Sequence, residues 1–223
     1  MLVFETIAVA FAMFSAIPVP QPVWNDRNMR YALCAFPLVG VVLGLLWWCW
    51  GALCGVLDLP ELLQAAGFCL LPPIVTGGIH LDGYADTSDA LASHADPVRK
   101  QEILKDSHIG AFSVIMLAVY GLIYLAGFAQ ITDSRSLMVY CFGFFLARCL
   151  SAIGVVSLPT AKKEGMLYRF AGSAHGRRVK LLLYIQLLVC CLLMMYISWI
   201  RGLAVILAAA ISYGYYVYRS RKE

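Results

Sequence analysis

Long apolar runs separated by short polar stretches dominate the pattern of this chain. A hydrocarbon core about 30 Å thick needs about 20 apolar residues of helix to cross it. Six runs come near or exceed that length, and we predict a membrane-spanning helix in each: residues 31–57, 62–79, 111–131, 137–158, 181–200 and 202–218. The pattern therefore predicts an all-α fold, a polytopic integral membrane bundle of about six transmembrane helices.

A shorter apolar run at residues 1–16 precedes the first predicted span. It carries Glu5, has no basic residue before its apolar stretch and runs into Pro18 and Pro20, so we expect mature structure and not a signal peptide. Its length is marginal for a crossing, which favours a re-entrant or interfacial helix. No internal repeat is visible, and we expect one membrane-embedded domain over residues 1–223.

The composition supports the membrane assignment, since 61% of the residues are hydrophobic and 13% are charged. An average soluble domain is roughly one quarter charged. The eight cysteines lie in or next to apolar runs without a C-x-x-C pair, so we interpret them as small hydrophobic side chains. The net charge of +4 bears mainly on loop orientation, and no nucleic-acid partner is expected.

Basic residues indicate how the chain is oriented, because short basic loops stay in the cytoplasm. Lys and Arg gather in the connections at residues 27–30, 99–105, 162–180 and 219–222, and alternate with connections poor in charge. We therefore expect a multi-pass protein of the cytoplasmic (inner) membrane. The acidic motif described next would face the cytoplasm.

The motif His80-Leu-Asp82-Gly-Tyr-Ala-Asp86-Thr-Ser-Asp89 carries the strongest chemical signal. On a helix, the i, i+4, i+7 spacing of its aspartates places three carboxylates on one face. Such carboxylates repel one another, and a divalent cation removes the conflict. Hard oxygen ligands suit magnesium, so Asp82, Asp86 and Asp89 are the predicted metal ligands and catalytic residues. The alternative is a solvated acidic helix end favoured by the helix dipole.

A second polar cluster, Lys105-Asp-Ser-His-Ile-Gly110, directly precedes the third predicted span. Lys105 could neutralise a phosphate, and Asp106 could complete a metal shell or act as a base. His108 is either a phosphate contact or an interfacial residue satisfied by water.

Two further basic sites have both a functional and a topological interpretation. Arg148 lies inside an apolar span, where charge is costly and usually points into a cavity, although a long side chain can also snorkel to the interface. Lys162 and Lys163 could face an anionic substrate, or could bind anionic lipid as part of a cytoplasmic basic loop.

Residues Gly77-Gly-Ile-His-Leu-Asp-Gly-Tyr-Ala-Asp-Thr-Ser-Asp89 resemble the G-G-x-H-x-D-G-x-x-D-x-x-D signature of the cobalamin synthase family, the adenosylcobinamide-GDP ribazoletransferases. Three other segments are similar to further family elements in the same order. They are residues 15–20 (T-R-x-P-x-P), residues 105–110 (K-D-x-x-x-G) and residues 161–165 (A-R-x-x-G).

The resemblance implies a magnesium-dependent membrane transferase that joins adenosylcobinamide-GDP to α-ribazole or its 5′-phosphate and releases GMP. The aspartates, with Asp106, would hold metal on the pyrophosphate, and the ribazole 5′ oxygen would attack the phosphorus attached to cobinamide. The implied substrate-binding residues are Gly77, Gly78, His80, His108, Arg148, Lys162 and Lys163. A homo-oligomer is left open.

The chain departs from the family pattern at Ala16, His108 and Lys162, where basic residues, usually Arg, are common. The family also continues into a G-G-x-T-G-D element, whereas this sequence stops at Glu223, so we expect magnesium binding with poor turnover. Two other classes stay open. A CDP-alcohol phosphotransferase would show D-G-x-x-A-R, and a cation or proton-coupled transporter would place its carboxylates near the bilayer midplane.

Overall fold

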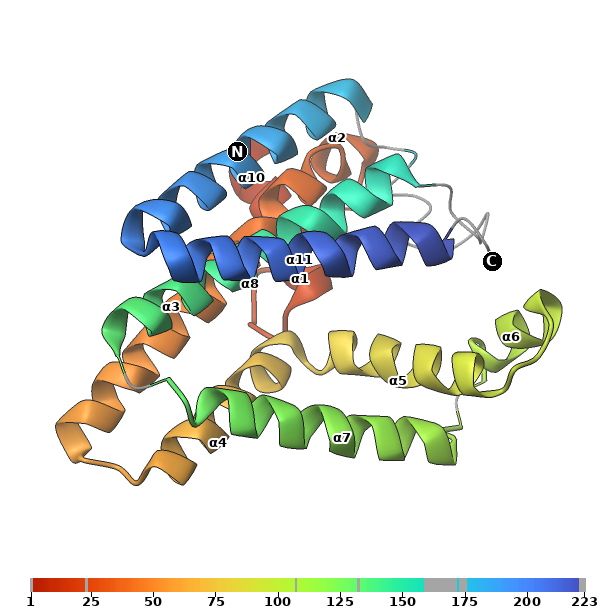
Figure 1. The fold of residues 1–223 in the computed structure, drawn as a ribbon. Helices are drawn as coiled ribbons and strands as arrows, with labels where there is room; N and C mark the ends of the chain where they lie inside the picture. Colours follow the sequence, from red (N-terminus) through yellow and green to blue (C-terminus); the bar gives the residue numbers. More distant parts are fainter. Residues whose placement is uncertain are drawn as a thin grey trace. The chain divides into compact units, whose positions relative to one another are not determined.

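Every regular element in the described part of the chain is an α-helix (Figure 1). The computed structural model describes residues 2–22, 24–106, 108–131, 133–158, 172 and 176–220. Helix packing divides the chain into two compact units, Met1–Cys49 with Thr132–Lys222 (the first unit) and Trp50–Ile131 (the second unit). The prediction of a single domain is not tested by this division.

The first unit joins the two ends of the sequence. It contains α1 (Leu2–Phe14), α2 (Asp26–Met29), most of α3 (Ala32–Leu57), α8 (Ser134–Ser157), α10 (Gly176–Ile197) and α11 (Trp199–Ser220). The second unit contains the end of α3 and then α4 (Glu61–Thr76), α5 (Ile79–Ala92), α6 (Pro97–Ile103) and α7 (Ala111–Phe128).

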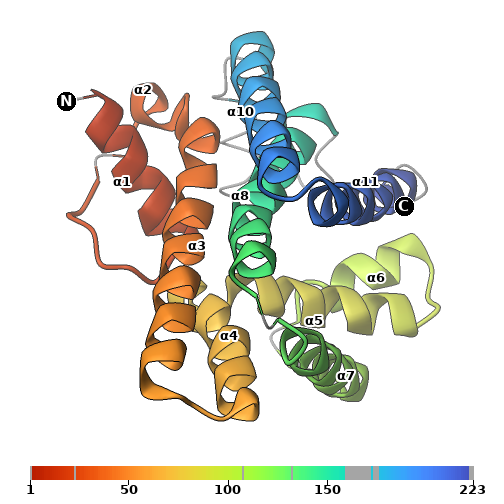
Figure 2. The same ribbon diagram turned by 60° about the vertical axis from the view of Figure 1, so that its left-hand side comes forward.

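Helix α1 lies beside α3 and contributes to the core of the first unit (Figure 2). Its side chains Val9 and Phe14 are buried with Leu33 and Phe36 of α3, and the rings of Phe14 and Phe36 lie 4.1 Å apart. With 13 residues, α1 is shorter than a straight crossing requires. Its predicted re-entrant or interfacial position in the membrane stays a prediction.

Five helices are long and apolar enough to cross a membrane, and the pair α4 and α5 would make a sixth span if it crosses as one. The predicted polytopic helical fold is therefore confirmed. The second span was predicted over residues 62–79 with an interruption at Pro72-Pro73, and the position of this interruption is wrong, because both prolines lie inside α4. Helix α4 ends at Thr76, and α5 begins at Ile79 with a bend of 94°.

Two glycines with left-handed backbones form this bend. Gly77 ends α4 at φ 64°, and Gly78 begins α5 at φ 76°. The N–H of Gly78 donates to the carbonyl of Pro73 over 2.8 Å, which satisfies an otherwise orphaned group of the last turn. Because side chains disfavour positive φ, glycine is the residue that permits this corner.

The predicted spans 181–200 and 202–218 place a turn at Arg201, and this position is wrong. The turn between α10 and α11 lies at Ser198. Arg201 and Gly202 belong to the first turns of α11. A Cβ atom on Gly202 would lie 2.6 Å from the carbonyl oxygen of Met194 in α10. Gly202 is therefore needed for the close packing of α10 and α11.

Candidate active site

The acidic motif forms one continuous helix, α5, as its spacing predicted. Asp82 lies exposed in the first turn, where a negative charge is favoured by the helix dipole. Asp86 and Asp89 are half-buried and follow on the same face. The hydroxyls of Thr87 and Ser88 each donate over 2.7 Å to carbonyls of the preceding turn, so both donors are occupied within the helix.

Helix α7 runs beside α5 (Figures 1 and 2), and an aromatic pair lies in the contact. The ring of Tyr84 in α5 lies 5.6 Å from that of Tyr120 in α7. Tyr120 stacks on Tyr124 at 5.1 Å, and Tyr124 meets Phe128 edge-on at 4.1 Å. The row continues along α7 and reaches α4, where the ring of Phe68 lies 6.3 Å from that of Phe128.

The carboxylate of Asp89 is bound to the start of α7. Its Oδ2 accepts a hydrogen bond from the N–H of Gly110 (2.7 Å), and its Oδ1 accepts one from the N–H of Ser113 (2.9 Å). The Ser113 hydroxyl lies 2.5 Å from Asp89 Oδ2 and 2.5 Å from the carbonyl oxygen of Ala85. The acidic motif and the segment Lys105–Gly110 thus meet at a defined contact.

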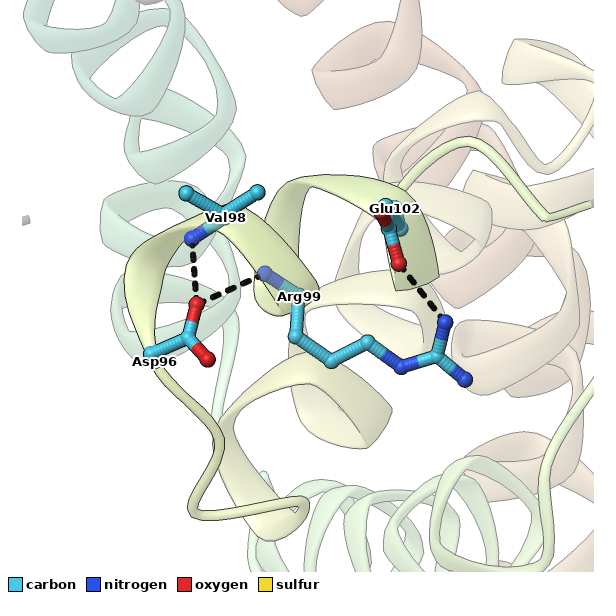
Figure 3. Close-up of polar contacts among 4 residues, drawn as sticks. All are labelled: Asp96, Val98, Arg99 and Glu102. Carbon is cyan, nitrogen blue, oxygen red and sulfur yellow. Dashed lines mark hydrogen bonds and ion pairs between the residues drawn. The ribbon is translucent and has the colours of Figure 1, made fainter.

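Helix α6 links α5 to that segment and has its own cap. The side chain of Asp96 accepts hydrogen bonds from the N–H groups of Val98 (2.9 Å) and Arg99 (3.0 Å), as Figure 3 shows. Arg99 pairs with Glu102 over 2.6 Å, and this hydrogen bond raises the pKa of the guanidinium. Both side chains are well exposed, so the pair contributes little to stability.

Asp106 and His108 contact each other in the segment after α6. Asp106 Oδ1 accepts hydrogen bonds from the backbone N–H of His108 (3.0 Å) and lies 2.7 Å from its ring Nδ1. The backbone bond first, and the ring contact next, lower the pKa of Asp106. The imidazole is 91% exposed, and Lys105 is exposed as well, so both can reach a bound molecule.

Arg148 lies in the first unit, not in the unit that carries the acidic motif. It is 7% exposed, its guanidinium sits 5.5 Å from the Phe144 ring, and its Nη1 donates to the Phe144 carbonyl over 3.4 Å. The side chain therefore turns back along α8 toward Phe144. Its contact with substrate and its snorkelling to the interface both stay predictions.

The remaining predicted substrate contacts divide into two groups. Gly77 and Gly78 form the corner before α5, and His80 is exposed in the first turn of that helix. Lys162 and Lys163 lie outside the described residues. Their contact with substrate stays a prediction.

A magnesium site can be tested against the side chains present. Across residues 2–22, 24–106, 108–131, 133–158, 172 and 176–220, no three His, Cys, Asp or Glu side chains gather as a metal site. Asp89 accepts hydrogen bonds from Gly110 and Ser113. Asp82 and Asp86 lie one helical turn apart on the same helix. Two carboxylates fit magnesium, which is commonly held by one or two of them together with substrate phosphates and water.

Sequence reasoning missed Ser113 and the structural role of Gly110. Ser113 is 1% exposed, and it is the only residue of α7, apart from the tyrosines, whose side chain carries a hydroxyl. That isolated hydroxyl in an apolar helix was an available signal. Its partners on α5 could not be predicted from spacing within one segment.

A cavity of about 600 Å³ lies in the first unit and is lined by side chains of α3, α8 and α10. Its lining is apolar apart from Gln186 and includes none of the predicted catalytic residues. The cavity is therefore no candidate for the phosphoryl chemistry.

Comparison with known proteins gives a consistent result. Residues 6–222 match the family model described as cobalamin-5-phosphate synthase. An adenosylcobinamide-GDP ribazoletransferase of Lachnoclostridium phytofermentans is 38% identical over 94% of this chain and 80% of its own length. One from Clostridium botulinum strain Alaska E43 is 28% identical over 99% of this chain and 87% of its own length.

A shorter match is found to a protein of the same name from Clostridium perfringens strain SM101. It is 35% identical over 69% of this chain, and the match spans 62% of that relative. No solved structure matches the chain.

Proposed function

Because this chain belongs to the cobalamin-5-phosphate synthase family, we propose that it joins adenosylcobinamide-GDP to α-ribazole or its 5′-phosphate. The products would be adenosylcobalamin, or its 5′-phosphate, and GMP. The observation that carries the proposal is the family match over residues 6–222, which includes the whole of the acidic helix α5.

The reaction needs a free ribose hydroxyl of α-ribazole to attack the phosphorus attached to cobinamide, so that a new P–O bond forms, the hydroxyl loses its proton and the P–O bond to GMP breaks. The 5′ oxygen expected from the resemblance does not fit this role, because it carries the phosphate that α-ribazole 5′-phosphate and its product both retain. Asp82 and Asp86 would hold magnesium beside the pyrophosphate. When bound, the ion would supply positive charge that stabilises the charge developing on the phosphoryl oxygens and on GMP. Lys105 is an exposed cation on a neighbouring segment and is suited to a phosphate oxygen.

His108 and Asp106 have separate tasks in this proposal. A carboxylate whose pKa is lowered stays ionised at neutral pH, so Asp106 accepts and the ring Nδ1 of His108 donates. The second ring nitrogen, Nε2, then remains for the substrate. A carboxylate of lowered pKa is also a weak base, which favours orientation of His108 over proton abstraction as the role of Asp106.

The proposed orientation places the acidic motif on the cytoplasmic side, where a nucleotide-linked substrate is available. The basic segments around Arg99, Lys100 and Lys105 support this orientation.

The test uses purified protein in nanodiscs with magnesium, adenosylcobinamide-GDP and α-ribazole, and follows GMP release. Asp82→Asn and Asp86→Asn should each lower kcat by on the order of a hundredfold or more. Asp96→Asn is the matched control, because Asn also caps a helix and α6 should be retained. Absence of GMP release by the unaltered protein, with cation flux in proteoliposomes instead, would favour a transporter.

A further inference from the structure

The third aspartate of the motif has surroundings unlike those of the first. Asp82 is exposed in the opening turn of α5, whereas Asp89, near the end of α5, accepts hydrogen bonds from Gly110 and Ser113 at the start of α7. Three donors at 2.5–2.9 Å surround the two oxygens of Asp89. Most of its acceptor capacity is therefore committed within the protein.

The backbone N–H groups in the first turn of α7 need a hydrogen-bond acceptor from outside their own helix. The N-cap residue, Gly110, has no side chain that could satisfy the orphaned N–H groups of the first turn. Asp89 meets this need from another helix, and its negative charge lies at the favourable end of the α7 dipole. The buried hydroxyl of Ser113 ties the same turn to Asp89 or to the carbonyl of Ala85.

The contact with Asp89 leaves room only for glycine at position 110. A Cβ atom there would lie 2.5–2.6 Å from the carboxylate atoms of Asp89, closer than real Cβ atoms approach. Its φ of −86° is ordinary for any residue, so the close approach of the carboxylate is the physical reason for glycine. Gly110 also closes the segment that carries Lys105, Asp106 and His108.

We propose that Asp89, Ser113 and Gly110 form a clamp that positions the Lys105–His108 segment for catalysis, and that Asp89 is a positioning residue and not a metal ligand. The inference rests on the proposed function for the reaction that the clamp serves. The clamp itself is defined by contacts within the second unit. Ser113 then joins the functional residues, although its side chain does not touch the substrate.

The first test separates metal binding from positioning, with Mn²⁺ alone as the probe, followed by electron paramagnetic resonance. Asp82→Asn should weaken Mn²⁺ binding about tenfold or more, whereas Asp89→Asn and Ser113→Ala should change it less than about twofold. Loss of Mn²⁺ binding in Asp89→Asn as large as that in Asp82→Asn would overturn the assignment.

The second test measures the position of the segment by trypsin cleavage, without reference to activity. Lys105 is exposed, and cleavage after Lys100 provides an internal reference in the same digest. Gly110→Ala and Asp89→Asn should accelerate cleavage after Lys105 relative to Lys100, because the anchor at Gly110 is loosened. An unchanged ratio in both variants would refute the clamp even if the proposed reaction proved wrong.

The third test uses kinetics and a conservative replacement. Ser113→Ala should lower kcat/KM by about tenfold with the same dependence on Mg²⁺ concentration, and Ser113→Thr, which keeps the hydroxyl, should restore most of the rate. The double variant Asp89→Asn with Ser113→Ala should lose far less kcat/KM than the product of the two single-variant losses, because both residues act through one contact. Additive losses, or failure of Ser113→Thr to restore activity, would contradict the proposal.

Discussion

Asp133 makes two kinds of contact at the start of α8. Its Oδ1 accepts the N–H of Ser136 (3.0 Å), and its Oδ2 lies 2.7 Å from the Ser136 hydroxyl, which makes it the N-cap of the helix. The guanidinium of Arg201 in α11 holds both carboxylate oxygens at 3.0 Å. The hydrogen bonds from Ser136, first from its hydroxyl and then from its N–H, lower the pKa of Asp133.

We predict that the cap matters more than the ion pair. Asp133→Ala should lower the Tm in detergent by roughly 2–4 °C, because the cap and the pair are both lost. Arg201→Gln removes only a pair that is half exposed, and should lower the Tm by less. Equal losses in the two variants would show that the pair dominates.

The stabilisation by the Asp133 carboxylate depends on pH, and the sign of this dependence follows from its lowered pKa. A folded-state pKa below the ordinary Asp value of about 3.9 means that the contribution is fully present above that value. It is lost as the pH falls through the lowered pKa. The gap in Tm between wild type and Asp133→Ala should therefore be constant from pH 7 to about pH 5 and should close in stronger acid.

Residue spacing predicted one part of the site and not the other. The helical period correctly placed Asp82, Asp86 and Asp89 on one face of α5. It treated the three as equivalent, because the partners of Asp89 lie 21 and 24 residues further along the chain. Which of the three carboxylates accepts hydrogen bonds from α7 depends on where α7 begins in space. The period of α5 alone contains no information about the position of α7.

The corner between α4 and α5 depends on backbone conformation and not on space for a side chain. Gly78 and Gly83 both have nothing within 4 Å of the place where a Cβ atom would be. Only Gly78 has a positive φ, of 76°, whereas Gly83 lies inside α5. The two positions therefore form a matched pair.

We predict opposite effects on stability for the same substitution at these two glycines. Gly78→Ala should destabilise the protein by about 1–2 kcal/mol because of the left-handed backbone. Gly83→Ala should be neutral or stabilising by up to about 1 kcal/mol, since alanine is the better helix former. Thermal unfolding of both variants in one detergent provides the measurement, and similar destabilisation in both would mean that φ at Gly78 does not determine the cost.

At this scale hydrophobic runs predicted which segments are helices better than where the helices end. Residues 31–57 and 111–131 correspond closely to α3 and α7, whereas residues 62–79 continue past a corner that hydrophobicity does not register. Gly77 and Gly78 lie in a run in which helix-breaking Pro72 and Pro73 are accommodated inside α4. Whether a glycine or a proline ends a helix in this run therefore depends on tertiary structure, which the hydrophobic pattern does not contain.

The orientation of the whole chain depends on whether α4 and α5 together cross the bilayer. If they cross as one broken span, the basic segments near residues 27–30 and 99–105 and the C-terminal residues beyond α11 lie on one side. If they form a re-entrant loop, the segment after α5 returns to the side of residues 58–61. The distribution of Lys and Arg favours the broken span.

Labelling of single cysteines in a background without the native cysteines tests this prediction. Cysteines placed at Ser93 and Ser220 should react from the cytoplasmic side, and one placed at Asp58 should react from the opposite side. Labelling of Ser93 and Asp58 positions from the same side would instead establish a re-entrant pair. The eight native cysteines are unpaired thiols in the described chain, so their replacement removes no disulfide.

The division into two units also has a consequence for the order of assembly during synthesis. The second unit is contiguous, so its helices are complete once Ile131 has left the ribosome. The first unit is completed later: α1 and α3 can pack on each other early, but their contacts with α8 and α10 form only when those helices follow, and Gln186 donates a hydrogen bond to the carbonyl of Cys34 across 152 residues. During that interval the faces of α1 and α3 that will form the core are open to lipid or to the insertion machinery. The core of the first unit therefore depends on contacts between helices that are far apart in the sequence.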